Sequence, residues 1–374
     1  MKKLGFGLMR LPLLDRTDDG SIDLEAAGKL VDRFLEKGFT YFDTAWAYHA
    51  HRSEAAVKTL LTDRYPRDRF ALATKLHANF LRAPEDRDRI FNAQLEKTGA
   101  GYFDRYLLHG IGGLSYPKYL EYDCFNWLRE KKRQGLARSI GFSFHGMPEL
   151  LDEILTNNPD LEFVQLQLNY LDWESPWIRS RECYETARRH NRPIVVMEPV
   201  KGGTLARLPE EAERLLKSCA PDASVSSWAL RFAASLEGVT TVLSGMGSLE
   251  QMEDNTGSFD DFQPLTSEER ALVFRAAEIV NARTAVPCTG CAYCVEGCPR
   301  KIAIPQYFSL YNEDMRESLE TKGWTANYNN YILLTGKFGR AVDCIACGQC
   351  ERVCPQQLPV IVHLKRVASH FDGV

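Results

Sequence analysis

The stretch DLEAAGKLVDRFLEKGFTYFD, residues 23–43, predicts one amphipathic helix that leads directly into one strand. Asp23 is a suitable N-cap, and Gly38 ends the helical pattern. The β-prone run Thr40–Phe42 follows at once. Between these signals the apolar residues recur at the spacing of one helical face: Leu24, Ala27, Val31, Phe34 and Leu35. This helix-then-strand unit is the repeating element of α/β folds.

The same alternation continues on both sides of that stretch, up to about residue 245. Segments of helical length separate seven further strand candidates: Gly5–Met9, Phe70–Thr74, Arg105–Leu108, Ser139–Phe142, Phe163–Leu168, Ile194–Met197 and Val239–Leu243. Eight strands with intervening helices predict an α/β fold, a parallel (β/α)8 TIM barrel. The alternative is an open, doubly wound sheet. Against it, Gly5-Phe6-Gly7 lacks the third glycine of a dinucleotide fingerprint, and no GxxxxGK[ST] motif occurs.

The chain length of 374 residues exceeds one barrel and predicts a second domain. Thr266 and Glu269 form a capping box that opens a last barrel helix, which we expect to run to about Asn281. We therefore expect the barrel over residues 1–285 and a second, smaller, mainly α-helical domain over residues 286–374.

The composition excludes several classes of protein. With 44% hydrophobic and 26% charged residues, the chain is expected to be globular and not disordered. A net charge of −4 argues against a nucleic-acid partner. The sequence lacks an apolar run of ~18 residues, and its N-terminus lacks the apolar stretch of a signal peptide. We therefore expect a cytoplasmic protein with no membrane partner.

Eight of the eleven cysteines form two copies of the pattern CxxCxxCxxxCP in the last quarter of the chain. Three cysteines at this spacing wrap one corner of an iron–sulfur cluster, and in two-cluster ferredoxins the fourth ligates the other cluster. The pattern predicts two [4Fe–4S] clusters, one held by Cys288, Cys291, Cys294 and Cys354, the other by Cys344, Cys347, Cys350 and Cys298. The alternative is a pair of zinc sites, which would not need this run twice.

The 45 residues between Cys298 and Cys344 exceed what a minimal bacterial ferredoxin needs. They include helix-compatible segments around 307–319 and 331–338, so the region resembles the α-helical ferredoxins found in iron–sulfur subunits of respiratory enzymes. Two neighbouring clusters imply electrons that are passed on one at a time. A purely structural role for the clusters is the alternative.

Four polar residues follow consecutive strands of the expected barrel, at the end where barrel enzymes place their chemistry: Asp43, Tyr48, Lys75 and His109. Together with the surrounding motifs they resemble the aldo-keto reductase superfamily over residues 1 to about 260. The matching segments are GFGLMR (5–10), FDTA (42–45) with Tyr48 and Ser53-Glu54, ATK (73–75), LLH (107–109), GFS (141–143) and residues 245–255. The resemblance implies an iron–sulfur-containing member of that superfamily.

The chemistry of these four positions can also be argued directly. A carbonyl that accepts hydride develops negative charge on oxygen and needs a proton donor. Tyr48, with an ordinary pKa near ~10, is expected to donate that proton if the charge of Lys75 lowers its pKa. Asp43 would hold Lys75 in place, and His109 would orient the carbonyl oxygen.

For nicotinamide binding, this sequence matches the family pattern at some positions and departs from it at others. Ser143 and Gln165 match positions that hold the carboxamide, and Asn255 matches one near the adenine. Departures from the family pattern are Phe144 in place of asparagine, Met197 in place of an aromatic ring, and Gly245 and Gln251 in place of the cations that grip a 2′-phosphate. NAD(P)(H) is expected as cofactor, with NADP preference in doubt, unless cations from loops substitute: Arg179, Lys201 or Arg207.

These observations predict an oxidoreductase that interconverts a small-molecule carbonyl and an alcohol and is accompanied by two [4Fe–4S] clusters. Hydride carries two electrons, whereas a cluster accepts one, so a flavin, a substrate or a redox partner protein would be needed to connect them. A first alternative is a reductase in which the clusters feed single electrons to a flavin or substrate in the barrel. A second is a non-catalytic electron-relay or regulatory subunit.

Overall fold

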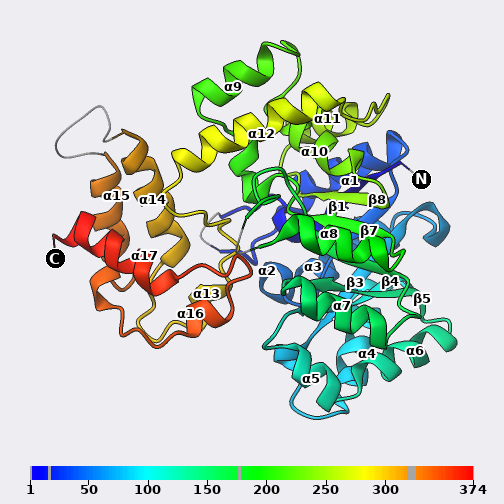
Figure 1. The fold of residues 1–374 in the computed structure, drawn as a ribbon. Helices are drawn as coiled ribbons and strands as arrows, with labels where there is room; N and C mark the ends of the chain where they lie inside the picture. Colours follow the sequence, from blue (N-terminus) through cyan, green and yellow to red (C-terminus); the bar gives the residue numbers. More distant parts are fainter. Residues whose placement is uncertain (1, 16–17, 176–177, 318–325, 374) are drawn as a thin grey trace.

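A computed structural model describes residues 2–15, 18–175, 178–317 and 326–373. Its central element is a closed barrel in which each strand pairs in parallel with the next, and β1 pairs with β8 (Figure 1). The strands are β1 (Leu4–Gly7), β2 (Tyr41–Asp43), β3 (Ala71–His77), β4 (Phe103–Ile111), β5 (Ala137–Phe144), β6 (Phe163–Gln167), β7 (Ile194–Met197) and β8 (Val239–Ser244). All eight predicted strands are present, and closure between β1 and β8 rules out the open sheet.

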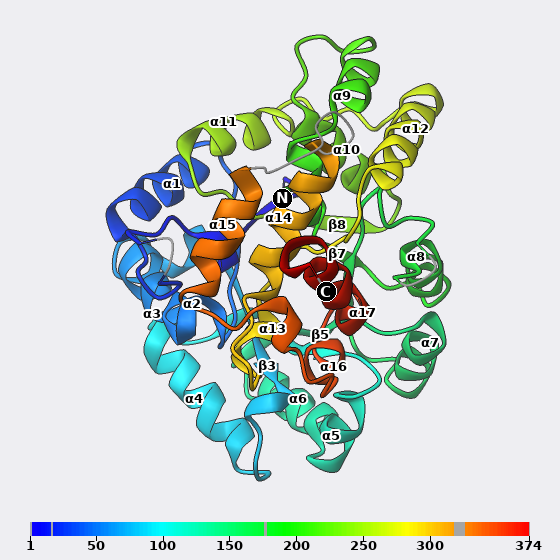
Figure 2. The same cartoon turned by 90° about the vertical axis from the view of Figure 1, so that its left-hand side faces the viewer.

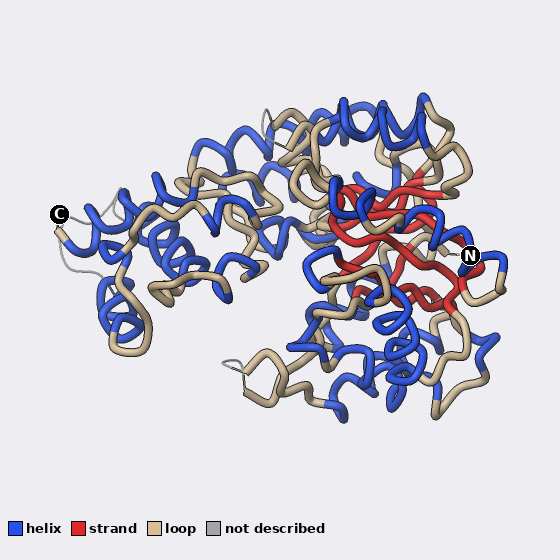
Figure 3. Tube along the Cα trace, turned by 90° about the horizontal axis from the view of Figure 1, so that it is seen from below, coloured by secondary structure: helices blue, strands red, loops and turns tan. Residues whose placement is uncertain are grey.

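Helices surround the barrel and bury its outer surface (Figure 3). They are α1 (Leu24–Glu36), α2 (Tyr48–His51), α3 (Ser53–Val57), α4 (Asp86–Thr98), α5 (Tyr116–Glu121), α6 (Cys124–Arg133), α7 (Pro148–Asn157), α8 (Ser180–Arg189), α9 (Glu210–Lys217), α10 (Val225–Ser235), α11 (Leu249–Gly257) and α12 (Ser267–Ala282). In α1 the Asp23 carboxylate accepts the N–H of Ala26 at 2.9 Å, and Gly38 adopts the left-handed conformation expected of a helix stop. The capping box of Thr266 and Glu269 opens α12.

The inside of the barrel is filled by side chains and is not a pore. Buried residues from six of the eight strands pack together in a layer inside the barrel: Tyr41, Ala73, Leu107, Phe163, Val195 and Leu243. The guanidinium of Arg105 lies 5.1 Å from the ring centre of Tyr41 and 4.9 Å from that of Phe163. Because this layer closes the barrel below, any site must lie above it, at the carboxyl ends of the strands.

The C-terminal part folds into short helices around its own core. These are α13 (Tyr293–Glu296), α14 (Ile304–Glu317), α15 (Ala326–Thr335), α16 (Gln349–Arg352) and α17 (Val360–Val367). The rings of Tyr331 and Phe371 stack at 4.7 Å, and Tyr307 packs on Tyr331. The two predicted helices are thus found with shifted ends. The predicted extension of the first to Leu319 lies outside the described residues.

This helical part, hereafter the tail, lies in front of the barrel strands (Figure 2). Residues of the tail line the same cavity as the carboxyl ends of the strands, so the tail covers that end of the barrel. In the described part of the chain, no helix has both the length and the apolar character needed to cross a membrane.

Candidate active site and cysteine cages

A cavity of about 610 Å³ lies between the carboxyl ends of the strands and the tail. Its lining includes all ten barrel residues that the sequence singled out as catalytic or cofactor-binding: Asp43, Tyr48, Lys75, His109, Ser143, Gln165, Met197, Gly245, Gln251 and Asn255. The tail contributes Cys291, Tyr293 and Pro355 to the same wall. Residues scattered over 300 positions of sequence therefore meet in one space.

The predicted catalytic group is assembled around the Lys75 ammonium. Lys75, fully buried on β3, forms a short ion pair with Asp43 and donates to the Thr44 carbonyl at 2.8 Å. Its Nζ lies 3.5 Å from the Tyr48 hydroxyl, and the Tyr48 and His109 rings meet edge to face at 6.0 Å. Lys75, Tyr48 and His109 thus lie side by side at the wall of the cavity.

The pKa of Tyr48 differs from the sequence-based expectation. Burial raises this pKa, the charges of Asp43 and Glu198 raise it further, and Arg10 opposes them. The expected lowering by Lys75 is not found, because burial penalises the phenolate and Asp43 already compensates the ammonium. Tyr48 therefore keeps its proton at neutral pH.

Three histidines gather beside Tyr48 and are uncharged. Burial lowers the pKa of His109 well below its usual range, with His77 and Lys75 contributing. Burial likewise lowers the pKa of His77 and of His145 to about 4. The His77 and His109 rings lie 5.1 Å apart, and Nδ1 of both His109 and His145 is buried without a hydrogen-bond partner. Neutral imidazoles can orient an oxygen without introducing charge.

A buried polar network behind Lys75 was not predicted from the sequence. Glu54 accepts hydrogen bonds from Thr74 at 2.7 Å and from Gln94 at 2.6 Å. Gln94 also donates to the Lys75 carbonyl at 3.0 Å and accepts from the Tyr106 hydroxyl at 2.6 Å. These bonds fix the strand that carries Lys75. A helical glutamine carries no sequence signal for this role.

The predicted nucleotide positions all line the cavity. Ser143 is buried, and its hydroxyl accepts the N–H of Gly110 at 2.7 Å. Gln165 has a buried Oε1 without a partner, so this atom remains available to a ligand. Asn255 donates to Ser244 at 3.0 Å, and Gln251 accepts the N–H of Gly247 at 2.8 Å.

The three cations considered as substitutes for a phosphate clamp do not line the cavity. Lys201 is buried in a short ion pair with Asp172, Arg179 is paired with Glu149 and Glu182, and the exposed Arg207 lies outside the lining. Arg10, which follows β1, is the cation that reaches the cavity beside Lys75. Its Nη2 also donates to the Thr289 carbonyl of the tail at 3.3 Å.

Glu198 also lines the cavity, and the sequence analysis did not predict it as a site residue. It follows β7 with a φ of 56°, an uncommon conformation for a residue with a side chain. Its Oε2 is buried without a partner, and burial raises its pKa while Arg10 and Lys201 lower it. Backbone held in this region often marks a functional site.

The eight cysteines are free thiols, and they gather in the two sets predicted from their spacing. Cys288, Cys291, Cys294 and Cys354 line one small cage, and Cys298, Cys344, Cys347 and Cys350 line another. Both cages also contain apolar side chains, among them Ile304, Phe308 and Leu364. The first, hereafter the inner cage, lies against the barrel, because Cys291 also lines the large cavity. The second is the outer cage.

The inner cage has the properties of an iron–sulfur site. Burial raises the pKa of its thiols, that of Cys291 to about 12, so four thiolates here require a compensating positive charge. Iron supplies such charge. The N–H of Gly290 already points at the Cys288 sulfur, at 3.4 Å. Donor set and surroundings therefore fit a [4Fe–4S] cluster.

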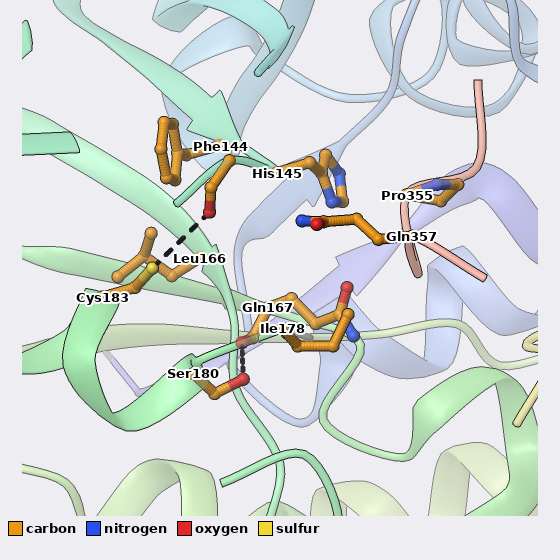
Figure 4. Close-up of a pocket in the computed structure, with 10 residues that line it drawn as sticks. Phe144, His145, Leu166, Gln167, Ile178, Ser180, Cys183, Pro355 and Gln357 are labelled. Carbon is orange, nitrogen blue, oxygen red and sulfur yellow. Dashed lines mark hydrogen bonds between the residues drawn. The ribbon is translucent and has the colours of Figure 1, made fainter. Parts of the chain in front are cut away.

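A buried polar network joins the barrel to the tail next to the inner cage. Gln356, two residues after Cys354, exchanges hydrogen bonds with Gln167 and accepts from Lys201 at 3.3 Å. Asp172 accepts from Gln167 at 2.8 Å and pairs with Lys201. Figure 4 shows the tail residues Pro355 and Gln357 opposite His145 and Gln167 of the barrel. The tail is therefore attached in one defined position.

Comparison with known proteins agrees with both parts of this description. The family model "Aldo/keto reductase family" matches residues 3–278, and the model "4Fe-4S dicluster domain" matches residues 287–358. The chain is 30% identical over 239 residues to an aldo-keto reductase of Mycolicibacterium vanbaalenii, covering 63% of this chain and 78% of the relative.

Solved structures resemble the barrel part. The aldo-keto reductase AKR11C1 of Bacillus halodurans, in its holo form, aligns with a TM-score of 0.60 at 27% identity, over 73% of this chain and 91% of that structure. An aldo-keto reductase of Klebsiella pneumoniae in complex with NADPH aligns with a TM-score of 0.56 at 19% identity, over 73% and 90% of the two chains, and supports the fold alone. The chain belongs to the aldo/keto reductase family of oxidoreductases and carries a 4Fe–4S dicluster domain at the mouth of its barrel.

Proposed function

We propose that the protein interconverts a small-molecule carbonyl and an alcohol with a nicotinamide cofactor, and that Tyr48 is the proton donor and acceptor. One observation carries this proposal: the buried Lys75 ammonium contacts both Asp43 and the Tyr48 hydroxyl at the wall of a cavity large enough for ligands. Tyr48 gives its proton to the oxygen that becomes the alkoxide. The neighbouring ammonium stabilises the phenolate left behind.

The other residues orient the reactants. His109 is neutral and donates to the carbonyl oxygen, and Asp43 holds Lys75 in place. The nicotinamide, when bound, supplies the hydride. Ser143 and the free Oε1 of Gln165 would hold its carboxamide, and Asn255 lies where the adenine would reach.

We infer that NAD, rather than NADP, is the nucleotide. Gly245 and Gln251 offer no charge to a 2′-phosphate, and Asp254 adds a carboxylate to the same wall. Arg10 is the available cation, since Lys75 is committed to Asp43. We assign Arg10 to the pyrophosphate. The cysteines are not joined in disulfides, as is typical of a reducing compartment, which supports a cytoplasmic location.

The test is turnover of a panel of aldehydes and ketones with NADH and NADPH, measured on anaerobically prepared holoprotein. Tyr48→Phe should lower kcat by about 10²–10⁴-fold while the affinity for the nucleotide is kept. Tyr184→Phe, which removes a hydroxyl bonded to the Glu237 carbonyl on the outside of α8, is the matched control and should leave kcat unchanged. Full activity of Tyr48→Phe on every substrate would contradict the proposal.

A second candidate function is supported by the position of the inner cage. Cys291 and Tyr293 line the same cavity as Tyr48, so a cluster held by Cys288, Cys291, Cys294 and Cys354 would adjoin whatever occupies that cavity. Electrons could then reach a flavin or a substrate one at a time. Two clusters held by the two cages would supply the two electrons, and two protons would complete the reduction of a carbonyl to an alcohol.

The two candidates differ in what reoxidises the clusters. In the second, holoprotein reduced chemically without any nicotinamide should be reoxidised on mixing with the carbonyl substrate or with a flavin, as followed by visible absorbance and electron paramagnetic resonance. Tyr48→Phe should slow the carbonyl reaction, because the proton is then missing. Clusters that stay reduced in the presence of substrate and flavin would contradict the second candidate and leave the first intact.

A further inference from the structure

The two cages face different surroundings. The inner cage lies between barrel and tail, whereas the outer cage opens to solvent: Cys347 is exposed, and the neighbouring Ile345 has 52% of its surface exposed. An electron that enters from another molecule therefore meets the outer cage first. The inner cage then lies between the outer cage and the cavity.

Exposed cations surround the outer cage. Arg300 lines it, and Arg352 donates to the Cys347 carbonyl at 3.4 Å. Lys301 is adjacent to the segment carrying Lys337 and Arg340, because its carbonyl accepts the N–H of Gly339 at 3.1 Å and Ile302 pairs with Gly339. All five side chains are exposed.

These cations are not neutralised by ion pairs within the described residues of the tail. The ion pair described there joins His370 to Asp314. Of the nearby carboxylates, Asp343 accepts the N–H of Arg340 and Glu351 accepts that of Ile361, while Glu296 is exposed. The five cations thus outnumber the acids on this face, although the whole chain carries a net charge of −4.

We propose that this basic rim, formed by Arg300, Lys301, Lys337, Arg340 and Arg352, is the docking surface for an acidic ferredoxin-type electron carrier. The inference rests on the proposed electron transfer through the clusters. A concentrated positive patch on a chain that is otherwise acidic orients a negatively charged partner. Exposed Ile345 and Cys347, which line the outer cage together with Arg300, then bring the partner's cluster close to the outer cluster.

The reaction at this surface transfers one electron. The reduced [2Fe–2S]⁺ centre of the carrier is oxidised to [2Fe–2S]²⁺, and the outer [4Fe–4S]²⁺ cluster is reduced to [4Fe–4S]⁺. No proton or bond is exchanged in this step. Two successive encounters load both clusters.

The experiment measures this step alone, by stopped-flow absorbance on anaerobic full-length holoprotein without substrate. The probe is a reduced plant-type [2Fe–2S] ferredoxin of acidic sequence. We expect the second-order rate constant to fall about tenfold between low and high salt. The double variant Lys301→Glu, Lys337→Glu should lower it by about tenfold at low salt.

A matched double variant controls for total charge. Lys58→Glu with Arg69→Glu changes the net charge equally, but both residues are exposed on the barrel, and Arg69 precedes β3 at the end remote from the cavity. It should change the rate less than about twofold. A reduced viologen, a small cation, should reduce the clusters of both double variants at least as fast as those of the wild type, which shows that the clusters are intact.

Three results would overturn the proposal. The first is ferredoxin reduction of Lys301→Glu, Lys337→Glu at the wild-type rate. The second is an equally slow reduction of the control double variant, which would show that the rate depends only on the total charge of the protein. The third concerns anionic lipid vesicles. If the wild type sediments with such vesicles, the rim variant does not, and ferredoxin reduces both at the same rate, the rim binds a membrane surface and not a ferredoxin. Since no carbonyl substrate is present, failure of the catalytic proposal would not alter these rates.

Discussion

Gln167 of the barrel and Gln356 of the tail donate to each other across the interface, at 3.0 and 3.1 Å. Both amides are buried, and the pair is completed by Lys201 and Asp172. Because Gln356 follows Cys354 by two residues, the same contact that attaches the tail also positions a cysteine of the inner cage. Docking of the tail and assembly of the cage are therefore one structural event.

Gln167→Leu should destabilise the protein by about 1–3 kcal/mol, because the Gln356 amide is then buried with donors unpaired. Adding Gln356→Leu should recover part of that loss, since two apolar side chains leave fewer unpaired groups. A double-mutant cycle on anaerobic thermal unfolding measures the coupling. A double variant whose loss equals the sum of the two single losses would show that the pair does not act as a unit.

Gly202→Ala should be more harmful than Gly290→Ala, although both glycines have a left-handed backbone, with φ of 63° and 69°. A Cβ on Gly202 would lie 2.3 Å from the Thr289 carbonyl oxygen, whereas one on Gly290 would meet nothing within 4 Å. Left-handed strain of about 1–2 kcal/mol is common to both variants. Only Gly202→Ala should also push away the loop that carries Cys288. Iron content per chain and the unfolding temperature test this, and equal iron loss in both would contradict it.

The sequence predicted the parts of this protein that depend on local order. The alternation around residues 23–43 predicts a strand and a helix, and eight such units close a barrel. The spacing of the cysteines, with the cross-over of Cys298 and Cys354, predicts which thiols gather, because a short loop with two residues between successive cysteines has few ways to reach a cluster. The family motifs predict that Tyr48 and Lys75 meet.

Other features depend on contacts between distant segments, which the sequence did not reveal. Gln167 and Gln356 are 189 residues apart, so nothing local indicates their pairing. Lys201 is one of the cations considered as substitutes for a phosphate clamp, yet it is buried against Asp172 and Gln356. The pKa of Tyr48 follows from burial, which the spacing of motifs does not express.

His77 should make the protein less stable in mild acid. Its pKa in the folded protein is about 4, below the ordinary 6.5, so the unfolded chain binds a proton first as the pH falls. The contribution is fully present above about pH 6.5 and is lost on acidification toward pH 4, with about 2 kcal/mol lost between pH 7 and pH 5. His77→Gln should flatten this part of the stability curve, whereas His51→Gln, at an exposed position, should not. Parallel curves for His77→Gln and the wild type would contradict the assignment.

Arg10 should be the residue on which nucleotide affinity depends most. It reaches the cavity beside Glu198 and lies against Gly245, whereas Arg207 is exposed and does not line it. Arg10→Met should weaken binding of NADH about tenfold, or ~1.4 kcal/mol, through loss of a charge-assisted hydrogen bond to the pyrophosphate. Arg207→Met should bind as the wild type does. Because Arg10 also donates to Thr289, iron content must be shown to be unchanged before fluorescence titrations are compared. Equal affinities of Arg10→Met and Arg207→Met would show that the pyrophosphate is held elsewhere, or that the cavity serves a ligand without one.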